Sequence, residues 1–148
     1  MKWAILAGIL LLLLYFFFPR KLKNGNLTVN GKDYQIEYAQ TTIQKAKGLS
    51  NRNSLCQNCG MLFVFSQTGI HPFWMKDTKI PLDMIWLDEN GKIVHYELAK
   101  PEPNIPITQL KIYKNSIPAK YVLELNSGDF DKLNLKTGDI VNIPNLND

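Results

Sequence analysis

Residues 60–88 read GMLFVFSQTGIHPFWMKDTKIPLDMIWLD. Two short apolar runs, GMLFVF and PLDMIWL, enclose a mixed aromatic and polar cluster, HPFWMKDT. Both runs are bounded by Gly, Pro or turn residues and are apolar at successive positions, which is typical of strands covered on both faces. The cluster between them combines rigid rings with hydrogen-bonding groups, a mixture that suits a ligand-facing rim. We therefore predict two central strands with a candidate ligand-binding segment between them.

Alternating segments on either side of this region predict further strands. LTV and KDYQIEYA are separated by Asn30-Gly31, which favours a two-residue hairpin because both positions accept positive φ. After the second apolar run, Asp88 to Gly91 predicts a turn into KIVHYELA, and YVLELN and IVNI predict two more strands.

Two short helices complete the expected fold. Thr41 or Thr42 can cap a helix over IQKAK that Gly48 would end, and DFDKLNL can form a helical turn. Six or seven short strands with one or two short helices predict a mainly β fold, an antiparallel β sandwich or barrel. We assign this globular domain to residues 24–148.

Residues 3–18 form an unbroken apolar run that precedes the domain and has basic residues on both sides. As a helix the run would span roughly 24 Å, slightly less than a bilayer core, so we predict an N-terminal transmembrane helix, with the anchor and its basic flank covering residues 1–23. A cleaved signal peptide is the alternative, but no small-residue cleavage site follows the run. An anchor this close to the start favours a domain outside the cytoplasm, although the basic flank alone favours the opposite orientation.

The charges are divided unevenly between the anchor and the domain. The chain has 17 Lys and Arg and 13 Asp and Glu residues, a formal net charge of +4. Four of the basic residues lie at or before residue 23 and all the acidic ones lie beyond it, so the domain is formally neutral. A neutral domain has no basic stripe to neutralise phosphates, which argues against a nucleic-acid partner.

Cys56 and Cys59 form the pattern Cys-x-x-Cys. A thioredoxin-like redox role would need the first cysteine at a helix N-terminus, whereas this pair leads into a predicted strand. A zinc site would need two more ligands, and only His71 and His95 are available, at spacings unlike those of zinc fingers. We expect a local disulfide or a free pair that stiffens the loop, and neither a metal nor a cofactor.

Two carboxylates occur inside predicted buried strands. Asp83 shares a strand face with Ile85 and Leu87, and Glu124 shares one with Val122. If these faces are covered, each carboxylate needs a hydrogen bond or a cation. The two could form an acid/base pair. Alternatively, each could have a structural partner in Arg52, Lys76 or backbone amides, and no motif of a known enzyme class is present.

Several motifs together resemble the family catalogued as domain of unknown function 192. The resemblance covers the chain from about residue 27 onward and is carried by Gly48-Leu49, Arg52, GMLFVF, FWMK-x-T, PLD, YVLEL and Gly138-Asp139. It implies a small, mostly β domain, often behind a signal or anchor, without an established activity; carbohydrate binding is a suggested role. The cysteine pair is not part of the family pattern.

We predict that the aromatic and polar motif residues meet around one cleft, formed by Arg52, Phe73, Trp74, Met75, Lys76, Thr78, Asp83 and Glu124. The leading hypothesis is a membrane-tethered, non-catalytic binding domain in which Trp74 stacks on a sugar or similar ring and the carboxylates accept hydroxyl hydrogen bonds. The alternative hypothesis is an envelope enzyme that uses Asp83 and Glu124 as acid and base. A third hypothesis is a scaffold in which Trp74 belongs to an ordinary core.

Overall fold

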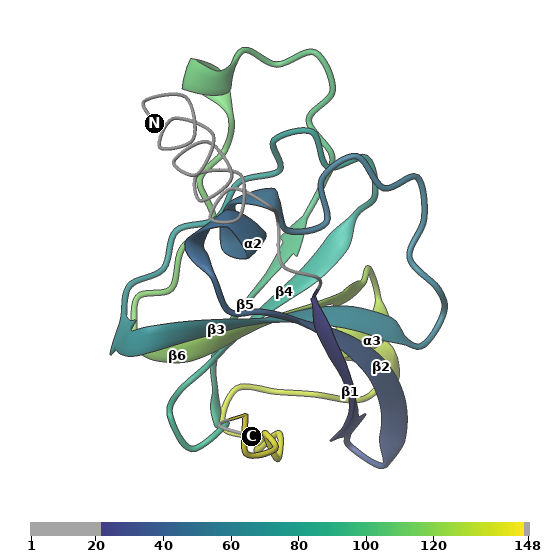
Figure 1. Cartoon of the computed structure of the whole chain (residues 1–148), viewed down its shortest axis with the longest axis vertical. Helices are drawn as coiled ribbons and strands as arrows, with labels where there is room; N and C mark the ends of the chain where they lie inside the picture. Colours follow the sequence, from purple (N-terminus) through teal and green to yellow (C-terminus); the bar gives the residue numbers. More distant parts are fainter. Residues whose placement is uncertain (1–21, 147–148) are drawn as a thin grey trace, which may run out of the picture.

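The computed structural model describes residues 22–146 and is mainly β (Figure 1). One sheet contains six strands: β1 (Lys23–Val29), β2 (Lys32–Ala39), β3 (Cys59–Gly69), β4 (Leu82–Leu87), β5 (Ile93–Ala99) and β6 (Ala119–Asn126). Two short α-helices, α2 (Thr42–Lys47) and α3 (Asp129–Lys132), and one 3-10 turn, η1 (Ile107–Gln109), accompany it. The predicted anchor lies outside the described residues. Within residues 22–146, no helix is long and apolar enough to cross a membrane.

The strand order is β1-β2-β3-β6-β4-β5, and the sheet is mixed. β2 and β3 are parallel, whereas the other neighbouring strands are antiparallel. The prediction of an antiparallel sandwich or barrel is therefore wrong, although the mainly β class and the short helices are confirmed. The parallel pair is possible because α2 and a long loop lie between β2 and β3, which gives the chain the length that a crossover needs.

The turns that local sequence signals predict are present in the structure. Asn30 and Gly31 have φ values of 43° and 79°, so the first hairpin closes through the positive-φ pair. Thr41 caps α2 in a reciprocal capping box with Gln44, and Gly48, with φ of 47°, follows its last residue. The predicted last strand, IVNI, is not a strand; an isolated bridge joins Ile140 to Lys92 instead.

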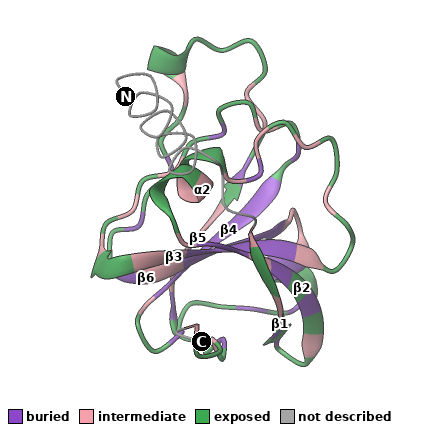
Figure 2. Ribbon diagram, viewed as in Figure 1, coloured by how far each residue is buried: buried purple, intermediate pink, exposed green. Residues whose placement is uncertain are grey.

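The sheet is covered on both faces, as Figure 2 shows by its buried central strands. We call one side the Phe130 face; it contains Leu27, Ile36, Ile85, Leu123 and Phe130. We call the other the Trp86 face; it contains Met61, Phe63, Met84, Trp86 and Val122. All six residues of β4 are buried, because alternate side chains enter the two cores. This arrangement confirms the interpretation of the apolar runs as strands covered on both faces.

Candidate functional site

A cavity of about 250 Å³ lies on the Trp86 face of the sheet. We call it the aromatic cavity. Its walls come from α2 and the residues after it, from the middle of β3, from the segment after β3 and from one residue of β6. The lining side chains used below are Lys45, Phe63, Phe65, Phe73, Trp74, Lys76, Thr78 and Glu124.

Five of the residues predicted from sequence line this one cavity: Phe73, Trp74, Lys76, Thr78 and Glu124. Met75 is buried in the core of the Trp86 face. Arg52 lies close enough to Glu124 to affect its ionisation. Asp83 does not join them, because it lies on the Phe130 face. The structure therefore brings most of the predicted residues together at one cavity and places Asp83 elsewhere; that they bind a ligand stays a prediction.

The segment from Phe73 to Thr78 is fixed by backbone and ring contacts. Phe73 and Tyr113 exchange two backbone hydrogen bonds of 2.8 and 2.9 Å. The Phe73 ring contacts Phe63 edge-on, with 4.8 Å between the ring centroids. With Met75 buried, Trp74 points outward and remains 45% exposed. An ordinary core position for Trp74 is therefore wrong, and its ring is accessible at the cavity.

Glu124 is the buried acid of the aromatic cavity. Its side chain comes from the middle of β6, next to Met61 of β3 and Met84 of β4, and only 4% of the residue is exposed. Burial raises the pKa of Glu124 to about 8, and the charge of Arg52 opposes this shift without a hydrogen bond. At neutral pH the carboxyl group is therefore largely protonated and can both donate and accept a hydrogen bond.

Arg52 is held by a carboxylate that the sequence did not reveal. Its two terminal nitrogens donate to the two oxygens of Glu37, at 2.5 and 2.7 Å, in a bidentate pair. The hydrogen bond to Glu37 raises the pKa of Arg52. Glu37 and Glu124 both pair with Met61 across adjacent strands, so Arg52 lies between the two carboxyl groups. The Glu37 pair thus fixes the cation that acts on Glu124.

Lys45 is a second residue that the sequence analysis missed. Its ammonium group donates to the Val64 carbonyl at 3.0 Å and lies 4.7 Å from the centre of the Phe65 ring. Burial lowers the pKa of Lys45. His71 also contacts the Phe65 ring, on which it stacks with 3.6 Å between the ring centroids. Burial lowers the pKa of His71 as well. A lysine on a short helix gives no sequence signal for such a position.

Asp83 has a structural role on the Phe130 face. Its carboxylate accepts hydrogen bonds from the Phe130 backbone N–H at 2.7 Å and from the Tyr96 hydroxyl at 3.0 Å. These bonds satisfy a fully buried group and attach the start of α3 to the sheet. Asp83 and Glu124 lie on neighbouring strands but point to opposite faces, since the register pairs Glu124 with Met84. The predicted acid/base pair is therefore wrong.

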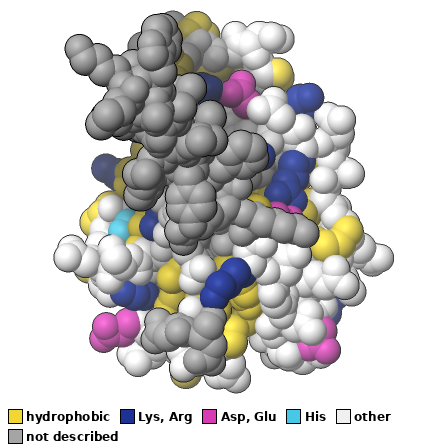
Figure 3. Space-filling model, in the orientation of Figure 1, with side chains coloured by type: hydrophobic (Ala, Val, Ile, Leu, Met, Phe, Trp, Pro, Cys, Tyr) yellow, Lys and Arg dark blue, Asp and Glu magenta, His cyan; other side chains and the backbone are white. Residues whose placement is uncertain are grey.

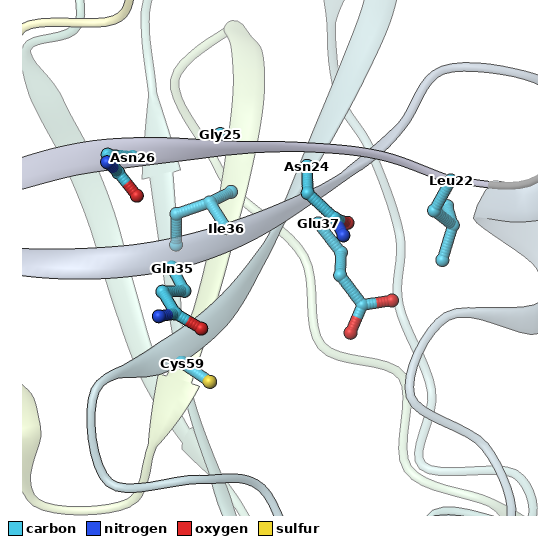
Figure 4. A pocket seen from close by; sticks show the side chains of 8 residues that line it. All are labelled: Leu22, Asn24, Gly25, Asn26, Gln35, Ile36, Glu37 and Cys59. Atoms are coloured by element: carbon cyan, nitrogen blue, oxygen red, sulfur yellow. The ribbon is translucent and has the colours of Figure 1, made fainter.

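A second cavity, of about 480 Å³, lies over β1 and β2 (Figure 4). Gln35 and Glu37 of β2 project toward the same side as Cys59 at the start of β3. The cavity has amide side chains and no aromatic ring, and its carboxylate is already paired with Arg52. Although the second cavity is larger, we regard the aromatic cavity as the better candidate. Only the aromatic cavity combines an accessible ring with a buried acid whose pKa is raised by burial.

Cys56 and Cys59 are joined by a disulfide beside this second cavity. The carbonyl of Cys56 accepts a hydrogen bond from the Asn126 side chain at 2.8 Å, which connects the loop to the end of β6. Among residues 22–146, no group of three or more His, Cys, Asp or Glu residues could hold a metal ion.

Comparison with known proteins supports the same fold. A crystal structure of a proposed transcription regulator from Sinorhizobium meliloti 1021 is similar, with a TM-score of 0.72 and 32% identity over 84% of this chain and 96% of that one. A protein of unknown function from Novosphingobium aromaticivorans DSM 12444 has a TM-score of 0.68 and 28% identity over 82% of this chain and 85% of that one. No curated protein gives a significant match.

The family comparison covers most of the described domain. The sequence pattern of DUF192, described as "Uncharacterized ACR, COG1430", matches residues 25–143, which extend from β1 to beyond α3. The chain therefore belongs to the DUF192 family.

Proposed function

We propose that this domain is a non-catalytic binding module for a small saccharide-like ligand in the aromatic cavity. One observation carries the proposal: a buried carboxyl group, Glu124, lines the same cavity as the half-exposed ring of Trp74. A sugar has an apolar ring face that can stack on tryptophan and hydroxyl groups that can exchange hydrogen bonds with a protonated carboxyl. Thr78 and Lys76 at the same cavity supply further polar contacts.

Binding fits this cavity better than two-carboxylate hydrolysis. Glycoside hydrolysis commonly uses a pair of carboxyl groups that flank one bond. Among the described lining residues Glu124 is the only carboxyl group, and Asp83 is separated from it by the sheet. The cavity therefore offers recognition by stacking and hydrogen bonding without the second group that such catalysis needs.

We further propose that the domain is tethered to a membrane through residues 3–18 and lies outside the cytoplasm. The apolar run at residues 3–18, with basic residues on both sides, supports the anchor. The Cys56–Cys59 disulfide supports an oxidising location, because such bonds persist mainly in exported proteins.

A nucleic-acid role, suggested by the description of the Sinorhizobium protein, has less support in this chain. Basic and acidic residues are equal in number beyond residue 23. Both signs of charge occur on the face shown in Figure 3, whereas a DNA-binding surface concentrates positive charge.

The binding proposal can be tested by titrating the full chain with neutral and acidic mono- and disaccharides and following tryptophan fluorescence and NMR shifts. We expect at least one sugar to perturb Trp74, and we expect Trp74→Ala to weaken that binding about tenfold through the lost stacking surface. Leu98→Ala, an exposed apolar change on β5, is the matched control and should bind normally. If folded protein shows no Trp74 response to any sugar, the saccharide assignment is wrong.

A further inference from the structure

The connection between β5 and β6 carries an unusual concentration of exposed apolar side chains. We call residues 101–118 the isoleucine loop. Its residues Ile105, Ile107, Ile112 and Ile117 are between 43% and 53% exposed, and the first two also line the mouth of a cavity with Met75 and Thr78. They make up four of the nine large apolar residues that are exposed within residues 22–146. Single exposed apolar residues are common, but a group of them on one segment marks an interaction surface.

The loop holds these side chains outward in a defined conformation. Tyr113 is buried and its backbone pairs with Phe73, which ties the loop to the segment beside the aromatic cavity. The buried Asn115 side chain donates to the carbonyls of Gly69 and Ile117, at 3.0 and 2.7 Å, and accepts from the His71 N–H at 2.8 Å. These contacts fix the part of the loop that carries Ile112 and Ile117.

Basic side chains accompany the isoleucines. Lys100, Lys111 and Lys114 are exposed, and Glu102 is the one acidic residue between positions 100 and 118. Glu102 also accepts a hydrogen bond from the Lys111 backbone N–H at 3.1 Å. At this end of the molecule Figure 3 shows hydrophobic, basic and acidic atoms near one another. Apolar side chains with adjacent lysines are the composition that binds the headgroup region of an anionic bilayer.

The loop lies on the side of the sheet where the chain enters the domain. Leu22, just before β1, packs against the same core cluster as Tyr113 of the loop, on the Trp86 face. Figure 1 shows the loop at one end of the molecule and the C-terminal segment at the other, with the sheet between them. The apolar run ends at Phe18 and β1 begins at Lys23, so the linking residues reach no more than about 18 Å even when extended.

We propose that the isoleucine loop is a second membrane contact, which docks on a phospholipid surface with anionic headgroups. This inference rests on the proposed anchor at residues 3–18 and is independent of the ligand in the aromatic cavity. The isoleucine side chains enter the boundary between headgroups and acyl chains, while Lys100 and Lys114 face the anionic headgroups. The Lys111 ammonium group lies 3.6 Å from the Glu97 carboxylate and contributes less. With the anchor, the loop gives the domain two attachments and therefore a fixed orientation on the bilayer.

The test uses the full chain reconstituted into vesicles of phosphatidylcholine and phosphatidylglycerol. Ile107→Cys places a single reactive thiol at the loop, because Cys56 and Cys59 are joined to each other. Ile140→Cys is the matched control, since Ile140 is also an exposed isoleucine but precedes Val141, which packs in the core of the Phe130 face. Each thiol carries a bimane label, and quenching by lipids with a shallow spin label reports proximity to the bilayer.

We expect quenching at position 107 to exceed that at position 140 by about threefold or more, and to fall when phosphatidylglycerol is omitted. Flotation of the vesicles tests the anchor separately. Protein that floats but shows equal quenching at the two positions would overturn the loop contact and leave the anchor intact. Protein that does not float would overturn both. Strong quenching at position 107 that is unchanged without phosphatidylglycerol would overturn the role of the lysines.

Discussion

Asp83 and Glu124 lie on adjacent strands, and both are carboxyl groups buried in the middle of one sheet, yet their surroundings differ completely. Asp83 receives hydrogen bonds from a backbone N–H and a tyrosine hydroxyl. Glu124 faces a cavity, and its pKa is raised to about 8 because burial outweighs the attraction of Arg52. The difference teaches that burial alone does not identify a functional carboxyl group. The distinguishing property is whether the protein itself supplies the hydrogen bonds.

The largest expected effect is the loss of stability when Asp83, the carboxylate that receives hydrogen bonds from the protein, is removed. Asp83→Ala should lower the free energy of unfolding by about 3–5 kcal/mol, because it leaves the Phe130 N–H and the Tyr96 hydroxyl buried without an acceptor. Urea denaturation measures the loss, and Asp83→Asn, which keeps one acceptor oxygen, should lose less. A loss below that of Glu124→Ala would contradict the structural role assigned to Asp83.

The second prediction concerns the pH dependence that Glu124 gives to stability. Its pKa is raised from 4.5 to about 8 on folding, so the folded state keeps its proton to a higher pH than the unfolded chain. The contribution of protonated Glu124 to the stability of the folded state is complete below pH 4.5 and is lost as pH rises through about 8. Glu124→Gln should therefore stabilise the protein by about 1–3 kcal/mol at pH 9 relative to wild type and have little effect at pH 5.

Equilibrium unfolding at several pH values measures this difference. Glu89→Gln, at an exposed carboxylate in the turn before β5, is a suitable control for the general effect of removing an acidic charge. An unchanged slope of stability against pH in Glu124→Gln would show that the raised pKa is not a property of this residue.

The third prediction tests the cation near Glu124. Arg52→Gln removes the charge that favours the ionised form of Glu124, so the pKa of Glu124 should rise further. A carboxyl-carbon NMR titration of the variant and wild type measures the two values directly. In Arg52→Lys the pKa of Glu124 should fall between these two values, because lysine keeps the charge but loses the bidentate contact with Glu37. A lowered pKa in Arg52→Gln would contradict the assigned geometry.

The smallest expected effect is on the ring beside the open cavity. Trp74→Ala should change the free energy of unfolding by less than about 1 kcal/mol because the ring is half exposed, whereas Trp86→Ala should cost about 3–5 kcal/mol. Thermal and urea unfolding of both variants provide the comparison. Equal losses of unfolding free energy in the two variants would show that Trp74 belongs to the core and would contradict its assignment to the binding site.

Local features of this fold could be predicted from sequence because they depend on neighbouring residues. Asn30-Gly31 set the first hairpin through positive φ, and Thr41, Gln44 and Gly48 defined α2 through capping. Within each strand, alternation also placed Asp83 with Ile85 and Glu124 with Val122, as the structure has them. The candidate cavity residues between Phe73 and Thr78 were found in the same way, from a compact mixed motif.

Features that depend on pairing between distant segments could not be predicted. Alternation in KDYQIEYA does not show that β2 pairs with β3 in parallel, nor that Glu37 meets Arg52. The opposite directions of Asp83 and Glu124 depend on the register of β4 against β6, which neither strand encodes alone. IVNI has the composition of a strand, but the structure shows only an isolated bridge between Ile140 and Lys92, because composition alone does not specify a partner strand.

The position of β6 has a consequence for how the protein is made. It lies between β3 and β4, although it follows both in the chain, and it joins the β1-β2-β3 part of the sheet to the β4-β5 part. During synthesis the two parts appear first, each with an unpaired edge, and neither can dock on the other until residues 119–126 arrive. A nascent chain interrupted before that point would expose both edges, so its protection from aggregation depends on how quickly the last strand is delivered.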